Sequence, residues 1–219
     1  MGHAKLPRKS TNIDMTAMCD VAFLLLTFFM LATKFKPDEP VVVKTPKSVS
    51  EIIIPDADIM LITVDPTGKI FFSIDNKLKR KELIDELSSQ KSLNLSEAEK
   101  TAFALGSSMG YPFSQLKSFL GATPDEQKAM EEKATGIPAD TAINIPTNEL
   151  GVWIDIARHT NPKLRICIKA DGAVSFPNFQ KVIKTLEGEK VFKFNLITDL
   201  EAVPMGTDAY IAKYGKGTK

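Results

Sequence analysis

The chain has 219 residues, with 28 basic and 27 acidic side chains and a formal net charge of +1. This balance leaves no electrostatic footprint for nucleic acid, so we expect no nucleic-acid partner. A mean hydropathy near zero argues against a protein with many membrane spans. The length predicts one or two domains with enough residues for a sizeable core.

The hydrophobicity is concentrated near the N-terminus, in residues 13–33, which read IDMTAMCDVAFLLLTFFMLAT. A helix from Met15 to Thr33 would rise roughly 28 Å, about the thickness of the hydrocarbon layer of a bilayer. A cleaved signal peptide has a shorter apolar core and a small-residue cleavage site. We therefore expect residues 13–33 to be a transmembrane helix that follows a short cytoplasmic tail, residues 1–12.

Asp20 is the feature of this helix that needs an explanation. Asp14 is the better helix cap because it precedes the apolar run, and Asp20 lies about 9 Å further along. The span contains no Lys or Arg to pair with it, and acids at such positions usually face a bundle interior or an aqueous path. At 100° per residue, Thr16 and Thr27 lie about 40° and 20° from Asp20, forming one polar stripe. A threonine in a span also bonds back to its own helix, so the stripe alone does not establish a path.

The energetics favour a carboxylate that gains and loses a proton. Placing an aspartate near the centre of an inserted helix costs on the order of 3 kcal/mol. A membrane potential of 100 mV supplies about 2.3 kcal/mol per charge, a comparable amount. The sequence therefore predicts that proton flow can switch Asp20 between its neutral and charged forms.

Residues 34–50 form a charged, Pro-containing linker with a β-branched run at Val41, Val42 and Val43. Such a run is typical of a short edge strand. An edge strand beside a flexible linker can add to the sheet of another copy. We therefore expect residues 41–43 to pair two copies of the chain as a dimer.

Two apolar runs, residues 59–64 and 69–74, are joined by Asp-Pro-Thr-Gly, which predicts a hairpin. The next segment predicts an amphipathic helix packed on a sheet, because its apolar residues recur near helical spacing: Leu78, Leu83, Ile84 and Leu87.

Residues 149–161 predict another helix, and residues 163–200 read strand, glycine turn, helix and strand, with apolar runs at 164–168 and 191–197. We therefore expect a small α/β domain, and an α+β fold overall. The domain would be built from residues 51–90 and 151–203.

Residues 91–150 differ in character, with polar helical segments broken by Gly and Pro and no strong strand signal. We expect a helical insertion outside the core fold, which could be deleted without loss of folding. The Gly- and Lys-rich residues 204–219 are typical of a mobile C-terminal tail.

No pattern in the chain indicates an enzyme. There is no Gly-rich phosphate loop and no nucleophile with a nearby histidine. His3 and His159 have no ligands at metal spacing, and Cys19 and Cys167 cannot plausibly pair within one chain. We expect no cofactor, no metal and a function centred in the membrane.

Four segments resemble the ExbD/TolR family of biopolymer transport proteins. IDMTAMCDVAFLLLTFFML resembles the family's span, in which a short basic tail, a Thr and an Asp precede an apolar run. VVVKTPKS resembles its next strand, ITVDPTGKIFFSID its hairpin, and RICIKADGAVSFPNFQKVIKTLEGEKVFKFNLIT its strand, helix and final strand. Ala17 stands where many members have Pro, and residues 91–150 have no counterpart in compact members.

The resemblance implies that Asp20 is the proton-carrying residue and Thr27 the family's polar helix position. It further implies two copies of the span inside a pentamer of an ExbB/TolQ-like multi-span partner, with energy passing to a TonB-like protein. The N-terminus would be cytoplasmic, and the domain periplasmic, anchored in the inner membrane. The open alternatives are a TolR-like or motility stator, and a passive anchor for a periplasmic binding module.

Overall fold

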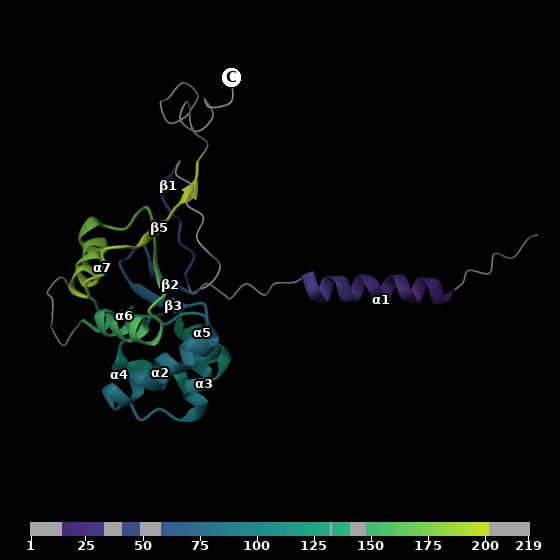
Figure 1. Cartoon of the computed structure of the whole chain (residues 1–219), viewed down its shortest axis with the longest axis horizontal. Helices are drawn as coiled ribbons and strands as arrows, with labels where there is room; N and C mark the ends of the chain where they lie inside the picture. The colour runs from purple at the N-terminus through teal and green to yellow at the C-terminus, as the bar shows by residue number, and fades with distance from the viewer. Residues whose placement is uncertain (1–14, 33–40, 49–57, 132, 141–147, 202–219) are drawn as a thin grey trace, which may run out of the picture. The chain divides into compact units, whose positions relative to one another are not determined.

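The computed structural model describes residues 15–32, 41–48, 58–131, 133–140 and 148–201. The chain divides into two compact units, residues 1–38 and 39–219 (Figure 1). The first unit contains the N-terminal helix and the second contains a mixed sheet with helices. The α+β fold class is therefore confirmed.

Helix α1, Met15–Ala32, forms the first unit. The described part of residues 13–33 is helical, as expected. Asp14 lies outside the described residues. The helix is long and apolar enough to cross a membrane, and none of its residues is buried in the chain itself. Such a surface must be covered by lipid or by another chain.

The second unit contains a four-stranded sheet in the order β3-β2-β4-β5. Strands β2, Ile59–Val64, and β3, Ile70–Ile74, form the expected antiparallel hairpin. Strands β4, Arg165–Ala170, and β5, Asn195–Ile197, continue the sheet in parallel. The hairpin turn is closed by Asp65, whose carboxylate accepts a hydrogen bond from the Lys69 backbone N–H at 2.8 Å.

Three helices pack with this sheet: α2 (Lys77–Lys91), α6 (Glu149–Thr160) and α7 (Phe176–Gly188). In α2, Leu83, Ile84 and Leu87 are fully buried, as expected. Leu78 is 75% exposed, contrary to expectation. It lies five residues before Leu83, about 140° around the helix, and so points away from the core.

The first strand that pairs within the chain lies after the β-branched run, and pairing of residues 41–43 with a second copy stays a prediction. Residues 41–43 form no strand, and β1 is Lys47–Ser48, which pairs in parallel with β6, Asp199–Leu200, of the same chain. The reason is that Val43 is buried in the domain, at 8% exposure. This burial takes the last residue of the β-branched run out of any exposed edge.

The final strand is also shorter than predicted, since β5 begins at Asn195 and not at Val191. Val191 is the third residue after the end of α7 and is buried in the loop, where its N–H donates to the Leu186 carbonyl at 2.8 Å. The chain therefore reaches the sheet only after three further residues, 192–194.

Residues 91–150 contain the expected helices, α3 (Glu97–Leu105), α4 (Phe113–Leu120) and α5 (Pro124–Glu131). The expectation that they lie outside the core is wrong. Phe72 of β3 exchanges two backbone hydrogen bonds with Met109, each 2.7 Å. The Ile137 N–H donates to the Ile70 carbonyl at 2.8 Å. The segment thus extends the sheet at its β3 edge.

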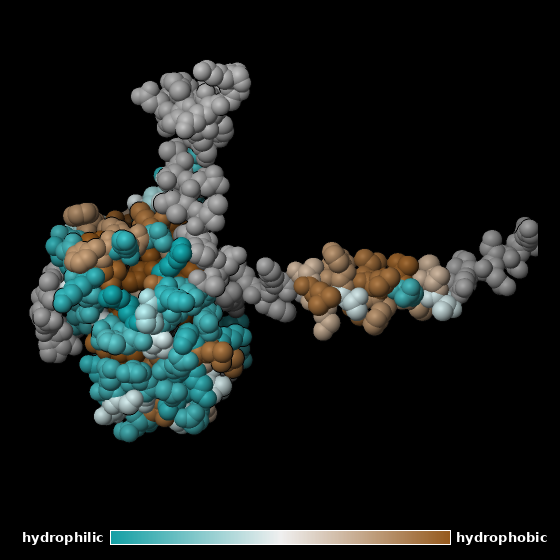
Figure 2. Space-filling view, viewed as in Figure 1, coloured by the Kyte–Doolittle hydropathy of each residue, from teal (hydrophilic) through white to brown (hydrophobic). Residues whose placement is uncertain are grey.

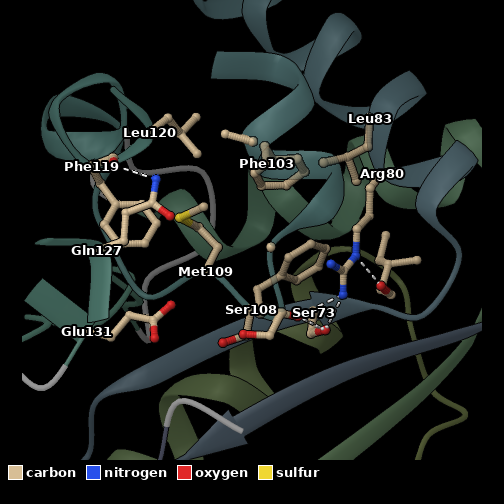
Figure 3. Close-up of a pocket in the computed structure, with 15 residues that line it drawn as sticks. Ser73, Arg80, Leu83, Phe103, Ser108, Met109, Phe119, Leu120, Gln127 and Glu131 are labelled. Atoms are coloured by element: carbon tan, nitrogen blue, oxygen red, sulfur yellow. Dashed lines mark hydrogen bonds between the residues drawn. The ribbon is translucent and has the colours of Figure 1, made fainter. Parts of the chain in front are cut away.

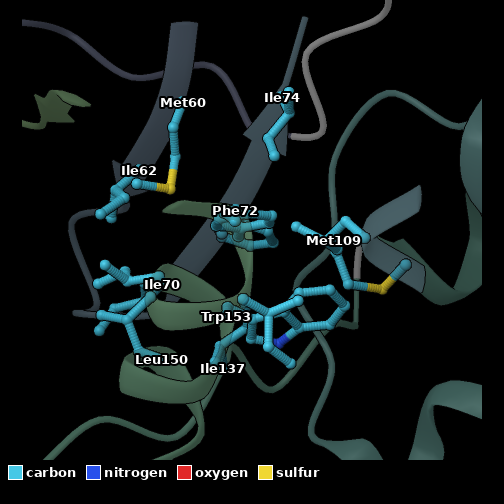
Figure 4. Close-up of a cluster of buried hydrophobic side chains, with 14 of the residues drawn as sticks. Met60, Ile62, Ile70, Phe72, Ile74, Met109, Ile137, Leu150 and Trp153 are labelled. Atoms are coloured by element: carbon cyan, nitrogen blue, oxygen red, sulfur yellow. The ribbon is translucent and has the colours of Figure 1, made fainter. Parts of the chain in front are cut away.

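Side chains from the same segment complete the hydrophobic core (Figure 4). Trp153 of α6 is fully buried and stacks on Phe72 of β3 and Phe103 of α3, with ring centroids 5.2 and 5.6 Å apart. Phe113 of α4 lies 5.6 Å from the same indole. A boundary at residues 91 and 150 therefore divides one continuous core.

Candidate proton site in the apolar helix

Asp20 is the only charged residue of α1. Figure 2 shows a helix surface that is hydrophobic or weakly polar apart from one hydrophilic spot. Within the described part of the chain, no ion pair to Asp20 is formed. A carboxylate in this setting can be stabilised in a membrane only by a proton, by water or by polar groups of another chain.

The threonines of the expected polar stripe lie in the same uninterrupted helix as Asp20. The angles derived from ideal helical geometry therefore apply to Thr16 and Thr27. The Thr27 hydroxyl donates back to its own helix, lying 3.0 Å from the Phe23 carbonyl oxygen and 2.9 Å from that of Leu24. Its oxygen keeps lone pairs that can accept a hydrogen bond from water or a protonated carboxyl.

The second unit shows no arrangement of catalytic groups among its described residues. No cluster of three His, Cys, Asp or Glu side chains that could hold a metal occurs there. His159 is exposed and lies 3.3 Å from Asp155. Cys167 is a free, buried cysteine, and burial raises the pKa of its thiol, which therefore stays neutral and unreactive.

The linker is attached to the domain by Asp171, in the turn after β4. Its carboxylate accepts hydrogen bonds from the backbone N–H groups of Lys44 and Ala173, both at 2.8 Å. The Gly172 N–H donates to the Lys44 carbonyl at 2.9 Å. No local pattern in the sequence indicates this contact, because its partners are 127 residues apart.

We expect Asp171→Ala to release the linker at Lys44. The two backbone hydrogen bonds lower the pKa of Asp171. A carboxyl whose pKa is lowered by folding stabilises the folded state at pH values above its unfolded-state pKa, about 4. This stabilisation is lost as the pH falls through the folded-state pKa. Hydrogen exchange should therefore show faster exchange of the Lys44 amide in the variant, and in the unaltered chain at acid pH. The control is Asp125→Ala, which removes an exposed acid of α5. Equal protection of the Lys44 amide in both variants would contradict the attachment.

Comparison with known proteins agrees with the arrangement of elements. A family model described as biopolymer transport protein ExbD/TolR matches residues 7–201. No curated protein and no solved structure gives a match. The matched range contains α1 with Asp20 and every strand and helix through β6.

Proposed function

The chain belongs to the ExbD/TolR family of biopolymer transport proteins, and we propose that it is an ExbD-like subunit in which Asp20 carries protons. Membership makes it an energy-transducing subunit of biopolymer transport, with an apolar helix suited to single-pass anchoring. The finer proposal is a stator driven by the proton-motive force. It would energise TonB-dependent transport across the outer membrane.

One observation supports proton carriage above the others: a single carboxylate within an apolar helix that offers it no partner. The cost of a charged Asp20, on the order of 3 kcal/mol, is removed when it is protonated. A membrane potential of 100 mV supplies about 2.3 kcal/mol per charge, which is comparable to the cost of the charged Asp20. Proton flow can therefore switch Asp20 between a neutral and a charged state.

The same helix supports the proposed partners. An ExbB/TolQ-like multi-span protein, as a pentamer around two copies of α1, would cover the exposed apolar surface and give Asp20 a polar environment. The N-terminus would lie in the cytoplasm and residues 39–219 in the periplasm. There the second unit would transmit energy to a TonB-like protein.

A dimer through residues 41–43 stays a proposal. Val42 is 86% exposed and available to a second copy, whereas Val43 is buried. Strand addition by all three valines would therefore require release of Val43 and of the contact between Lys44 and Asp171.

We expect the purified chain to be heterogeneous in detergent alone and uniform when produced with its multi-span partner. The reason is the cost of Asp20 in a helix that faces lipid. Size-exclusion chromatography with light scattering measures the difference. A monodisperse monomer of the isolated chain in lipid nanodiscs would count against a required partner.

Thr27→Val should weaken energised transport to a lesser degree than loss of the Asp20 carboxylate. The substitution removes one acceptor from the polar stripe but keeps side-chain volume and the titrating group. Because the Thr27 hydroxyl also bonds to its own helix, helix stability should change little. Partner-dependent substrate import is the measurement, and a total loss in Thr27→Val would assign the hydroxyl a larger role than proposed.

A further inference from the structure

A small cavity lies where residues 102–131 meet the sheet and α2 (Figure 3). Its volume is about 30 Å³, room for about two water-sized molecules. One part of its wall is apolar, formed by Phe103, Met109 and Leu120 among others. The other part carries hydrogen-bond donors.

The principal donor is Arg80 of α2, which is only 8% exposed. Its Nε donates to the Ile74 carbonyl, and its Nη2 donates to the Ser73 hydroxyl at 3.0 Å and the Ser107 carbonyl at 2.7 Å. All three acceptors are neutral. Among the described residues, no hydrogen bond uses Nη1.

No carboxylate of the described residues forms an ion pair with this buried cation. Burial lowers the pKa of Arg80, and the exposed Asp75 opposes that shift only through its charge. Arginine nevertheless stays protonated in proteins. A buried positive charge without a counter-ion is costly, so this site favours an anion.

Ser108 supplies an independent indication. Its hydroxyl oxygen is buried and has no hydrogen-bond partner, and Ser108 lines the same cavity. A buried hydroxyl without a partner is destabilising. The cavity is therefore lined by two residues, Arg80 and Ser108, that each keep a donor group without an acceptor among the described residues.

We propose that this cavity binds one small monovalent anion, of the size of chloride or formate, between Arg80 and Ser108. The available volume suits an ion of this size. Glu131 also lines the cavity, and its carboxylate repels any anion, a divalent one more strongly than a monovalent one, so the monovalent charge is favoured. Charge-assisted hydrogen bonds from a guanidinium are the strong ones. The anion would join α2 to the segment 107–108 and so hold the inserted helices on the sheet.

Trp153 provides the readout, because it is the only tryptophan and it stacks on Phe72 and Phe103, which both line the cavity. Bromide is titrated into the purified full-length chain at constant ionic strength, with gluconate as the reference anion too large to enter. Since Trp153 is fully buried, collisional quenching should be weak. We expect bromide to quench the Trp153 fluorescence up to a saturating level, and we expect added chloride or formate to restore the fluorescence.

Ser108→Ala should weaken bromide binding about tenfold or more, because a hydrogen bond to a charged group is worth about 1.5–3 kcal/mol. Arg80→Met should abolish bromide binding, and circular dichroism establishes whether this variant folds. If Arg80→Met does not fold, Ser108→Ala still tests the proposal. Arg165→Met, an exposed cation of β4, is the control and should titrate like the unaltered chain.

The thermal midpoint gives a second measurement, since an anion that binds only the folded state raises it with concentration. Chloride in place of gluconate should raise the midpoint of the unaltered chain and of Arg165→Met, and should raise that of Ser108→Ala less. Linear quenching that is equal in all variants, with no chloride-dependent midpoint, would show that the cavity holds water only and overturn the proposal.

Discussion

We expect Asp20→Asn to reduce energised transport to the background of a strain that lacks the protein, while membrane insertion and assembly are kept. Asn preserves the size and the hydrogen-bonding capacity of the side chain but cannot exchange a proton. Removing the charge also removes a cost on the order of 3 kcal/mol in the apolar helix. The inactive variant should therefore be no less stable than the original.

Asp20→Glu is the matched variant, because it keeps a titrating carboxyl and moves it by about one bond length. It should be partly active if the path tolerates the shift. The measurement is partner-dependent substrate import, with the amount of assembled complex determined in the same membranes. A passive anchor predicts that Asn serves helix association at least as well as Asp, so full import by Asp20→Asn would favour that alternative.

The second large effect concerns the inserted helices. Phe103→Ala should lower the free energy of unfolding of the second unit by about 3–5 kcal/mol, because it leaves a cavity beside the buried ring of Trp153. Leu105→Ala, two residues along the same helix and 65% exposed, should change it by no more than about 0.5 kcal/mol. Urea unfolding followed by Trp153 fluorescence compares the two variants.

Deletion of the segment should have a still larger effect. A chain in which Gln90 is joined to Asn148 by a short Gly/Ser linker loses the backbone pairing of Met109 with Phe72 and the stacking partners Phe103 and Phe113. We expect no cooperative thermal transition from its soluble part. A cooperative transition at an unchanged midpoint would show that the sheet and its remaining helices form a core without the insertion.

The elements that the sequence predicts well are those specified by local patterns. The apolar run of α1, the Asp-Pro-Thr-Gly turn between β2 and β3, and the helical spacing of Leu83, Ile84 and Leu87 each depend on neighbouring residues. The structure agrees with all three. Asp20 was identified in the same way, because a lone acid in an apolar run is a local signal.

The elements that were misplaced depend on contacts between distant residues. Residues 91–150 are polar overall, and only tertiary packing shows that Phe103 and Phe113 meet at Trp153. The run at residues 41–43 has the composition of a strand, yet it forms none within the chain, where Val43 is buried and the Lys44 N–H donates to Asp171. Composition carries no information about such partners.

Proton uptake into vesicles that contain the assembled complex tests the central claim most directly. A potassium diffusion potential drives uptake, and a pH-sensitive dye inside the vesicles records it for the original chain, Asp20→Asn and Asp20→Glu at equal complex content. The proposal predicts potential-driven uptake in the original chain, reduced uptake in Asp20→Glu and none above the protein-free leak in Asp20→Asn. Uptake by Asp20→Asn at the original rate would contradict a proton-carrying Asp20.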